Sequence, residues 1–319
     1  MKKNKYFYME PLAKNIVFID GIPRTGKLMT GALVSSLNRM ESLEFGETFE
    51  HFLPALKLKK CTFDFAKSYL CNYINQMIYN KMISRNVNFR STDRTGIPNY
   101  FNPKVYKKRL KMEEGDSVLK RIKKRKLILP FITHDIMVNY SIFSKLKINV
   151  KYIQIFRDPI DLAYSWYKRG LSNRFGKDQR VFTLLIEKDK KPYPWYLYNF
   201  SKSFVKMNNC ERSIYYVILL TKKSIKEYKK IKNKKIYLTT YEKMVEETNK
   251  EVQKISKYLN TSFSKKTLSF IKKEKLPKKL KNTIRINKLK FLKNKVNPKI
   301  FKELVSLSKK YNKNLYGLV

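Results

Sequence analysis

Short apolar runs alternate with segments of helical apolar spacing along the first 260 residues. The runs are rich in β-branched and aromatic residues and predict buried strands at 16–19, 127–133, 150–156 and 235–240. Helical spacing follows at 27–37, 63–84, 137–146, 159–169, 194–207, 213–231 and 252–259. Strands that alternate with helices form a parallel sheet, with ligand sites at the strands' carboxyl ends. We therefore predict an α/β fold with a parallel central sheet flanked by helices.

The remaining segments complete a single predicted domain over 1–319, with its core at about 15–260. Residues 44–53 predict a short strand and a loop that carries Glu47, Glu50 and His51. Residues 86–126 are turn-rich and then basic, which indicates an insertion that either shapes the acceptor side or forms a mobile surface loop. Residues 261–319 form a basic, partly helical tail, and no internal repeat occurs.

The loop at 21–27 joins the first strand to the first helix and carries Gly21, Pro23, Arg24, Gly26 and Lys27. Backbone N–H groups of such a loop and the positive end of the helix stabilise an anion above the strand. The spacing Gly-x-x-x-x-Gly-Lys also fits the nucleoside-triphosphate P-loop. Leu28, however, stands where that motif needs Ser or Thr to hold Mg²⁺. An ordinary turn between strand and helix is the third interpretation.

A second anion site is predicted where the strand at 150–156 ends. Arg157 ends the strand, Pro159 occupies a first helical position, and Ser165 lies about two turns on, on the same side as the helix start. An arginine with a serine hydroxyl above it binds a phosphate group well. A ligand with two separated phosphate groups would span this site and the loop at 21–27.

The two motifs, in this order and spacing, resemble those of the sulfotransferases that use 3′-phosphoadenosine 5′-phosphosulfate (PAPS). Thr133-His134 is similar to the family's Thr-His pair before the Arg-Asp-Pro strand, and Tyr241-Glu242 is similar to its Tyr-Glu segment. The resemblance covers about residues 15–260. It implies a P-loop-containing nucleotide-hydrolase-like fold, PAPS as co-substrate and no metal.

Roles for individual residues follow from the same resemblance. It places the 5′-phosphosulfate on the loop residues Pro23, Arg24, Thr25, Gly26, Lys27 and Thr30. It places the 3′-phosphate on Arg157 and Ser165. His134 is then the catalytic base, and Arg24 neutralises the sulfonate and the leaving phosphate. Glu50 is the rival base, because glycosaminoglycan sulfotransferases have a catalytic glutamate after their second strand.

The chain departs from the family pattern at three places. Lys27 and Leu28 follow Gly26 where hydroxyl residues are usual, and Ile132 replaces a lysine before the Thr-His pair. A Gly-rich 3′-phosphate loop is absent near the C-terminus, where a basic substitute is available from Lys278, Lys279, Lys281 and Arg285.

Charge and cysteine content narrow the choice of partner and compartment. The formal net charge is +46, with lysine runs such as 229–235, which favours polyanionic partners. Codon bias in an AT-rich genome would give the same lysine excess, so both explanations stay open. Three widely spaced cysteines indicate a reducing compartment without a zinc site or disulfide framework. Without a signal peptide or membrane span in the pattern, we expect a cytoplasmic protein.

The function we predict is transfer of the sulfonate group from PAPS to an acceptor hydroxyl, with a carbohydrate as the expected acceptor and no need for nucleic acid. Two alternatives stay open: a P-loop kinase or NTPase that acts on a small substrate, and a non-catalytic polyanion-binding protein. The oligomeric state, the acceptor's identity and the choice between His134 and Glu50 as base are not decided by the sequence.

Overall fold

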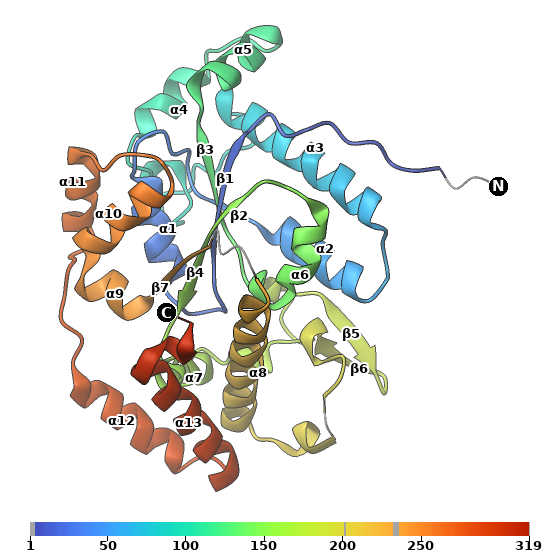
Figure 1. Ribbon diagram of the computed structural model, residues 1–319, viewed down its shortest axis with the longest axis vertical. Helices are drawn as coiled ribbons and strands as arrows, with labels where there is room; N and C mark the ends of the chain where they lie inside the picture. The colour runs from blue at the N-terminus through green and yellow to red at the C-terminus, as the bar shows by residue number, and fades with distance from the viewer. Residues whose placement is uncertain (1–3, 201, 232–235, 319) are drawn as a thin grey trace.

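A five-stranded parallel sheet forms the centre of the protein (Figure 1). The computed structural model describes residues 4–200, 202–231 and 236–318. The strand order is β2-β3-β1-β4-β7, and every pairing is parallel. The strands are β1 (Asn15–Asp20), β2 (Glu44–Phe45), β3 (Ile128–Ile132), β4 (Lys151–Phe156) and β7 (Ile236–Thr240). Lys235, where we expected the last strand to begin, and much of the lysine run at 229–235 lie outside the described residues.

Helices cover both faces of the sheet, which explains why the strands are almost continuously apolar. Val17 and Ile19 face one layer, and Phe18 between them faces the other. The first layer consists of α1 (Lys27–Ser35), α9 (Tyr241–Glu246), α10 (Thr248–Tyr258) and α11 (Lys265–Lys273). The second includes α2 (Glu47–Lys57), α3 (Phe63–Met82), α6 (Tyr140–Phe143), α7 (Pro159–Lys168) and α8 (Asn209–Lys229). The predicted α/β fold class is confirmed.

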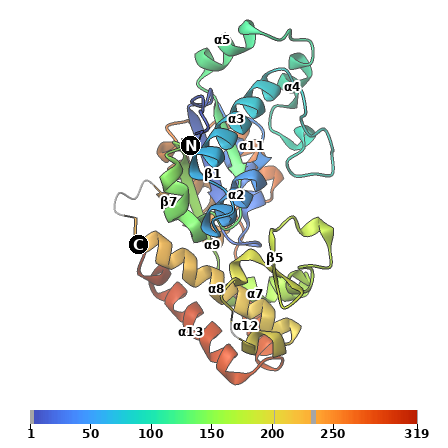
Figure 2. The same cartoon turned by 90° about the vertical axis from the view of Figure 1, so that its right-hand side faces the viewer.

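The remaining elements lie at the two ends of this core. Figure 2 shows α4 (Pro103–Arg109) and α5 (Asp116–Arg125) at one end, and α12 (Asn282–Lys293) and α13 (Pro298–Asn314) beside α7 and α8 at the other. A hairpin of β5 (Leu185–Lys188) and β6 (Lys191–Pro194) lies apart from the main sheet. Short 3₁₀ turns span Ile97–Asn99, Met137–Asn139, Ser144–Leu146, Leu171–Asn173, Gln179–Val181, Trp195–Leu197, Lys202–Lys206 and Leu315–Gly317. No described helix is both long enough and apolar enough to cross a lipid bilayer.

Three local predictions were wrong. The strand at 44–53 stops at Phe45, and α2 begins at Glu47, since two acidic side chains in a first turn stabilise a helix start. Residues 137–146 form 3₁₀ turns around the four-residue α6. The described residues of 194–200 and 202–207 form no α-helix. Their large aromatic side chains pack against α8 from 3₁₀ turns, as the contacts of Tyr196 and Phe204 with Tyr216 show.

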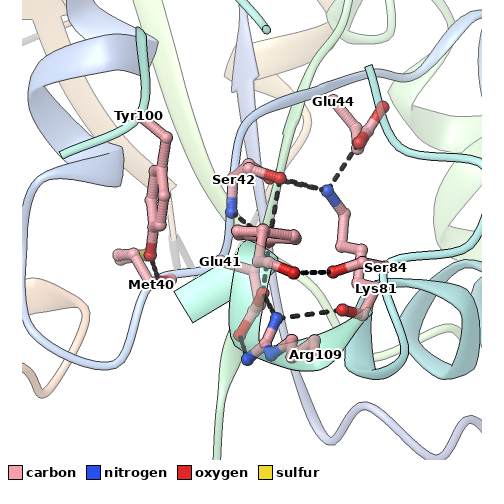
Figure 3. A network of polar contacts seen from close by, with 9 residues as sticks. Met40, Glu41, Ser42, Glu44, Lys81, Ser84, Tyr100 and Arg109 are labelled. Carbon is pink, nitrogen blue, oxygen red and sulfur yellow. Dashed lines mark hydrogen bonds and ion pairs between the residues drawn. The ribbon is translucent and has the colours of Figure 1, made fainter. Parts of the chain in front are cut away.

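A buried polar network ties the segment at 86–126 to the start of β2 (Figure 3). The guanidinium of Arg109 on α4 makes two hydrogen bonds to the Glu41 carboxylate, at 2.7 and 2.8 Å. The Tyr106 hydroxyl donates to the same carboxylate at 2.5 Å, and the Lys81 ammonium contacts Glu44 at 2.5 Å. Since the segment contains buried side chains and two helices, its placement depends on these contacts with the main body.

Tyr106→Phe should lower the free energy of unfolding by about 1–2 kcal/mol, because the buried Glu41 carboxylate loses one of its donors. Urea unfolding followed by circular dichroism measures this difference. Tyr69→Phe is the matched control, since the Tyr69 side chain is 48% exposed and a change there should stay within about 0.5 kcal/mol. Equal stability of both variants would contradict a stabilising role for the network.

Candidate active site at the carboxyl end of the sheet

The loop between β1 and α1 is tightly folded around two glycines. Gly26 has φ 92°, and a Cβ atom there would lie 2.5 Å from the Tyr241 ring. A Cβ atom at Gly21 would lie 2.5 Å from the Ile155 carbonyl oxygen. Any larger residue would therefore open the loop or displace its neighbours. The loop's backbone leads directly into the N-terminus of α1, as an anion site at a helix start requires.

Lys27 lies inside the loop, where its ammonium donates to the Gly21 carbonyl. Burial lowers the pKa of Lys27 to about 8, although the Asp20 carboxylate opposes the shift. Thr25 Oγ1 donates to the Ile22 carbonyl at 3.0 Å. The Thr30 hydroxyl is buried, and among the described residues it has no hydrogen-bond partner.

Arg24 and Arg157 join the loop to the second predicted anion site. Arg24 Nε donates to Ser165 Oγ at 3.1 Å, and Arg157 Nη1 donates to the Arg24 carbonyl at 2.9 Å. Trp166 Nε1, next to Ser165, donates to the Pro23 carbonyl at 2.8 Å. The two motifs, more than 130 residues apart in the sequence, thus form one continuous surface.

This surface is electropositive. Burial and the cations Arg169 and Arg157 lower the pKa of Arg24, which remains a guanidinium cation. Among the described residues, no carboxylate lies within ion-pair distance of Arg24 or Arg157. Arg157 Nε is also buried without a described partner. Unpaired arginines and an unpartnered Thr30 hydroxyl fit a ligand with two phosphate groups.

Arg285 also reaches this region, from α12, but its guanidinium is already paired. Its Nε donates to Asp158 Oδ2 at 3.1 Å, and its Nη2 donates to Ser308 Oγ at 2.8 Å. The other predicted basic residues, Lys278, Lys279 and Lys281, are exposed on the chain before α12. In the structure, Arg285 therefore balances Asp158, the neighbour of Arg157.

The two candidate bases are in contact. Glu50 Oε1 accepts a hydrogen bond from the His134 backbone N–H and lies 3.1 Å from His134 Nδ1. Burial raises the pKa of Glu50 to about 8, while burial and the Lys27 ammonium hold the pKa of His134 well below its usual range. At neutral pH the imidazole is uncharged. His134 and Glu50, which the sequence analysis gave as alternative catalytic bases, are thus hydrogen-bonded to each other.

Glu50 lies on the helix α2 and not on the predicted loop, and its carboxylate contacts His134. His51 is the next residue of the same helix, but its side chain contacts a different segment. The His51 imidazole Nε2 lies 2.8 Å from the Phe182 carbonyl oxygen, and both residues line one cavity. Glu47 also lines this cavity. Glu47, Glu50 and His51 therefore line the same cavity as Pro23, just beyond the end of β1.

Two buried carboxylates belong to the site but were missed by the sequence reasoning. Asp20, the last residue of β1, accepts hydrogen bonds from the Thr133 and Tyr152 hydroxyls and from two backbone N–H groups. Burial raises the pKa of Asp135 above its usual range, and Asp135 Oδ1 has no described partner. Their positions at the ends of apolar runs, beside the predicted loop and base, were the available signal.

The Glu50 environment predicts a pH effect on stability. Native Glu50 keeps its proton up to about pH 8, whereas an unfolded glutamate loses it near pH 4.5. The native state then binds more protons, so the free energy of unfolding falls as pH rises through this window. Between about pH 7 and 8, where an unfolded histidine is largely neutral, the contribution of Glu50 to this slope should reach at most about 1.4 kcal/mol per pH unit.

Glu50→Gln should reduce this slope but not abolish it, since burial also raises the pKa of Asp135 to about 8. The exposed Glu187→Gln should leave the slope unchanged. Urea unfolding at about pH 7, 7.5 and 8 compares the variants with the wild type. The same slope in the wild type and in Glu50→Gln would show that Glu50 is not protonated in the native protein.

A cavity of about 520 Å³ opens beside this pair. Its lining includes Pro23 of the loop at 21–27, His134, Glu50 and Asp135, so the loop and both candidate bases share one space. From the segment at 86–126 only Asp93 is among the described lining residues, whereas residues 171–196 form much of the wall. The expectation that the insertion shapes this side therefore applies to a single residue. No three His, Cys, Asp or Glu side chains gather at a metal-binding distance in the described part of the chain.

Three solved structures are similar to this chain at low identity. The sulfotransferase domain from the curacin biosynthetic pathway has 12% identity and a TM-score of 0.45, over 83% of this chain and 78% of its own. The sulfotransferase domain of the Synechococcus PCC 7002 olefin synthase has 13% identity and a TM-score of 0.43, over 98% of each chain. Sulfotransferase STF9 from Mycobacterium avium has 12% identity and a TM-score of 0.42, over 89% of this chain and 77% of its own.

No curated protein matches the chain. A family profile described as the sulfotransferase domain, however, matches residues 14–314, nearly the full length. This range includes the phosphate loop, the His134–Glu50 pair and the Arg-Asp-Pro motif. The chain therefore belongs to the sulfotransferase family.

Proposed function

We propose that this sulfotransferase takes its sulfonate group from PAPS and transfers it to an acceptor hydroxyl. The observation that carries the proposal is the junction of the two motifs, where Arg24 and Arg157 lie side by side without described carboxylate partners. PAPS has two separated phosphate groups, one of which carries the sulfonate. The loop from Pro23 to Lys27, with Thr30 behind it, would hold the 5′-phosphosulfate, and Arg157 with Ser165 would hold the 3′-phosphate.

His134 is the base that we propose for the acceptor hydroxyl. Its imidazole is neutral at physiological pH, its Nδ1 is oriented by Glu50, and it lines the cavity that Pro23 also lines. The negative charge of a phosphosulfate beside Lys27 would raise the pKa of His134 toward the working pH, because it offsets the ammonium's effect. Glu50 then acts as a positioning residue.

Arg24 would stabilise the charge that develops as the sulfur–oxygen bond breaks. Its guanidinium reaches from the loop to Ser165, so it lies between the two predicted phosphate positions. Arg285 would act on the 3′-phosphate only indirectly, by balancing the charge of Asp158. The exposed Leu28 at the position of a P-loop Mg²⁺ ligand disfavours a kinase or NTPase.

A turnover assay tests this proposal. Purified protein is incubated with PAPS labelled with ³⁵S and a panel of hydroxyl compounds, and labelled product and free 3′,5′-adenosine bisphosphate are quantified. We expect acceptor-dependent release of the bisphosphate without added metal. Phosphoryl transfer from ATP and Mg²⁺, with no release from PAPS, would support the kinase alternative. The carbohydrate acceptor stays a prediction from the sequence. The residues that line the cavity give separate information about the chemical class of the acceptor.

A further inference from the structure

The cavity beside His134 is much less basic than the molecule around it. The chain has 71 lysines and arginines against 25 acidic residues. Nevertheless, none of the described residues that line the cavity is a lysine. Two arginines face four carboxyl groups, those of Glu47, Glu50, Asp93 and Asp135. Even where burial keeps some of these groups protonated, they offer no attraction to an anionic acceptor.

Both arginines of the cavity are already engaged. Arg180 Nε and Nη2 bond the Asp178 carboxylate at 2.9 and 3.0 Å. Arg174 Nη2 donates to the Arg169 carbonyl at 3.0 Å, and its Nε lies 4.0 Å from Asp178. An acidic polysaccharide needs a track of free cations, and this cavity does not supply one. The protein's lysine excess therefore lies elsewhere on the molecule.

Six of the described residues that line the cavity are Phe, Tyr or Trp. Trp166, Trp195 and Tyr196 are buried, and Phe175 packs against Tyr196 with ring centroids 6.1 Å apart at 88°. Trp195 packs against Tyr196 at 5.5 Å and 80°. The hydrogen bond from Trp166 Nε1 to Pro23 fixes this wall against the phosphate loop. Such edge-to-face packing makes a rigid apolar surface that suits a flat, apolar ring.

The cavity is also limited in size. Its volume of about 520 Å³ is in the range of small-molecule sites. The contact of His51 with the Phe182 carbonyl joins α2 to the segment at 171–196, which lies below α2 in Figure 1. This hydrogen bond connects the two segments that supply most of the cavity's lining.

We infer that the acceptor is a small molecule with an aromatic or other apolar ring body that carries the reacting hydroxyl, and not an acidic polysaccharide. This inference rests on the proposed function, since the cavity is an acceptor site only if the donor binds at the loop. In the reaction, a bond forms between the acceptor oxygen and sulfur. The bond from sulfur to the bridging oxygen of PAPS breaks, 3′,5′-adenosine bisphosphate leaves, and the hydroxyl proton passes to His134.

The test compares three acceptors with labelled PAPS: 2-naphthol, the neutral disaccharide maltose and the acidic polysaccharide chondroitin. Transfer to 2-naphthol at a kcat/KM at least about 100-fold above the other two is expected. Preference for maltose or chondroitin would overturn the inference. Tight binding of 3′,5′-adenosine bisphosphate without transfer to 2-naphthol would also overturn it, while the proposed donor would stand. Failure to bind the bisphosphate would refute the proposed function itself.

A pair of exposed phenylalanines provides a matched control. Phe182 lines the cavity and is 68% exposed, and Phe89 is 44% exposed and does not line it. Phe182→Ser should raise the KM for 2-naphthol about fivefold to tenfold, because apolar contact with the acceptor is lost. The dissociation constant of the bisphosphate should stay the same, and Phe89→Ser should change neither quantity. An unchanged KM in Phe182→Ser, or an equal rise in both variants, would contradict the inferred acceptor contact.

Discussion

His134→Ala should lower kcat for sulfonate transfer about 1,000-fold, within the range expected for loss of a general base. The backbone N–H of His134, which holds Glu50, stays in place, and the removed side chain is 32% exposed, so the fold should survive. The dissociation constant of 3′,5′-adenosine bisphosphate should change by less than about twofold, because the loss affects the reaction and not donor binding. Steady-state kinetics and calorimetric titration measure the two quantities.

Glu50→Gln separates the two candidate bases. If Glu50 only orients the imidazole, the amide should keep part of the activity, since its oxygen can still accept the hydrogen bonds from His134. A nearly wild-type rate in His134→Ala together with a large loss in Glu50→Gln would assign the base role to Glu50. It would contradict the mechanism proposed for His134.

Arg157→Ala should weaken binding of 3′,5′-adenosine bisphosphate about 100-fold. A charge-assisted hydrogen bond to phosphate is worth about 1.5–3 kcal/mol, and Arg157 also holds the backbone of Arg24. The ring of Tyr241 lies 4.1 Å from its guanidinium and keeps the side chain in place. Calorimetric titration of the variant measures the loss of affinity.

The exposed Arg125→Ala on α5 is the control, because it removes the same charge far from the loop. Its affinity should match that of the wild type. An equal loss in both variants would mean that the bisphosphate binds to the overall positive field of the protein. The melting temperature of Arg157→Ala is also compared with that of the wild type. A similar value shows that the loss of the Arg157–Arg24 hydrogen bond leaves the variant folded.

Much of the fold was predictable because its signals are local. β1, β3 and β4 are apolar runs that end at Gly21, Thr133 and Arg157, and each run was identified within one or two residues of its observed bounds. The loop at 21–27 is marked by its glycines and proline. A parallel sheet then gathers these strand ends at one edge, which explains why the motifs could be combined into one site before their contacts were known.

The errors arose where tertiary contacts decide the local structure. The aromatic residues at 195–204 have helical spacing, yet they pack against α8 from 3₁₀ turns. Short segments such as Glu44–Phe45 carry too few residues for a periodic pattern, so the start of α2 was interpreted as part of a strand and a loop. Amphipathic spacing is a weak guide when a segment is short or is held by neighbours.

The residues of the two motifs could be named as candidates from the sequence, but Asp20, Asp135 and the contacts between the motifs could not. The bond of Arg285 to Asp158 spans 127 positions, and the junction of Arg24 with Ser165 spans 141. Neither contact can be inferred from a single sequence. The same is true of the cavity, whose walls come from α2 and the irregular segment at 171–196. The overall charge favoured polyanionic partners and the sequence reading a carbohydrate acceptor, whereas the lining residues favour an apolar acceptor.

The central claim is that the joined motifs bind the two phosphate groups of PAPS. The most direct measurement is calorimetric titration of the protein with 3′,5′-adenosine bisphosphate and, in parallel, with ATP and Mg²⁺, each repeated at raised salt. The account predicts tight binding of the bisphosphate that persists at raised salt, because the site is partly buried and specific. Preference for ATP with Mg²⁺, or equally weak binding of both that disappears with salt, would contradict it.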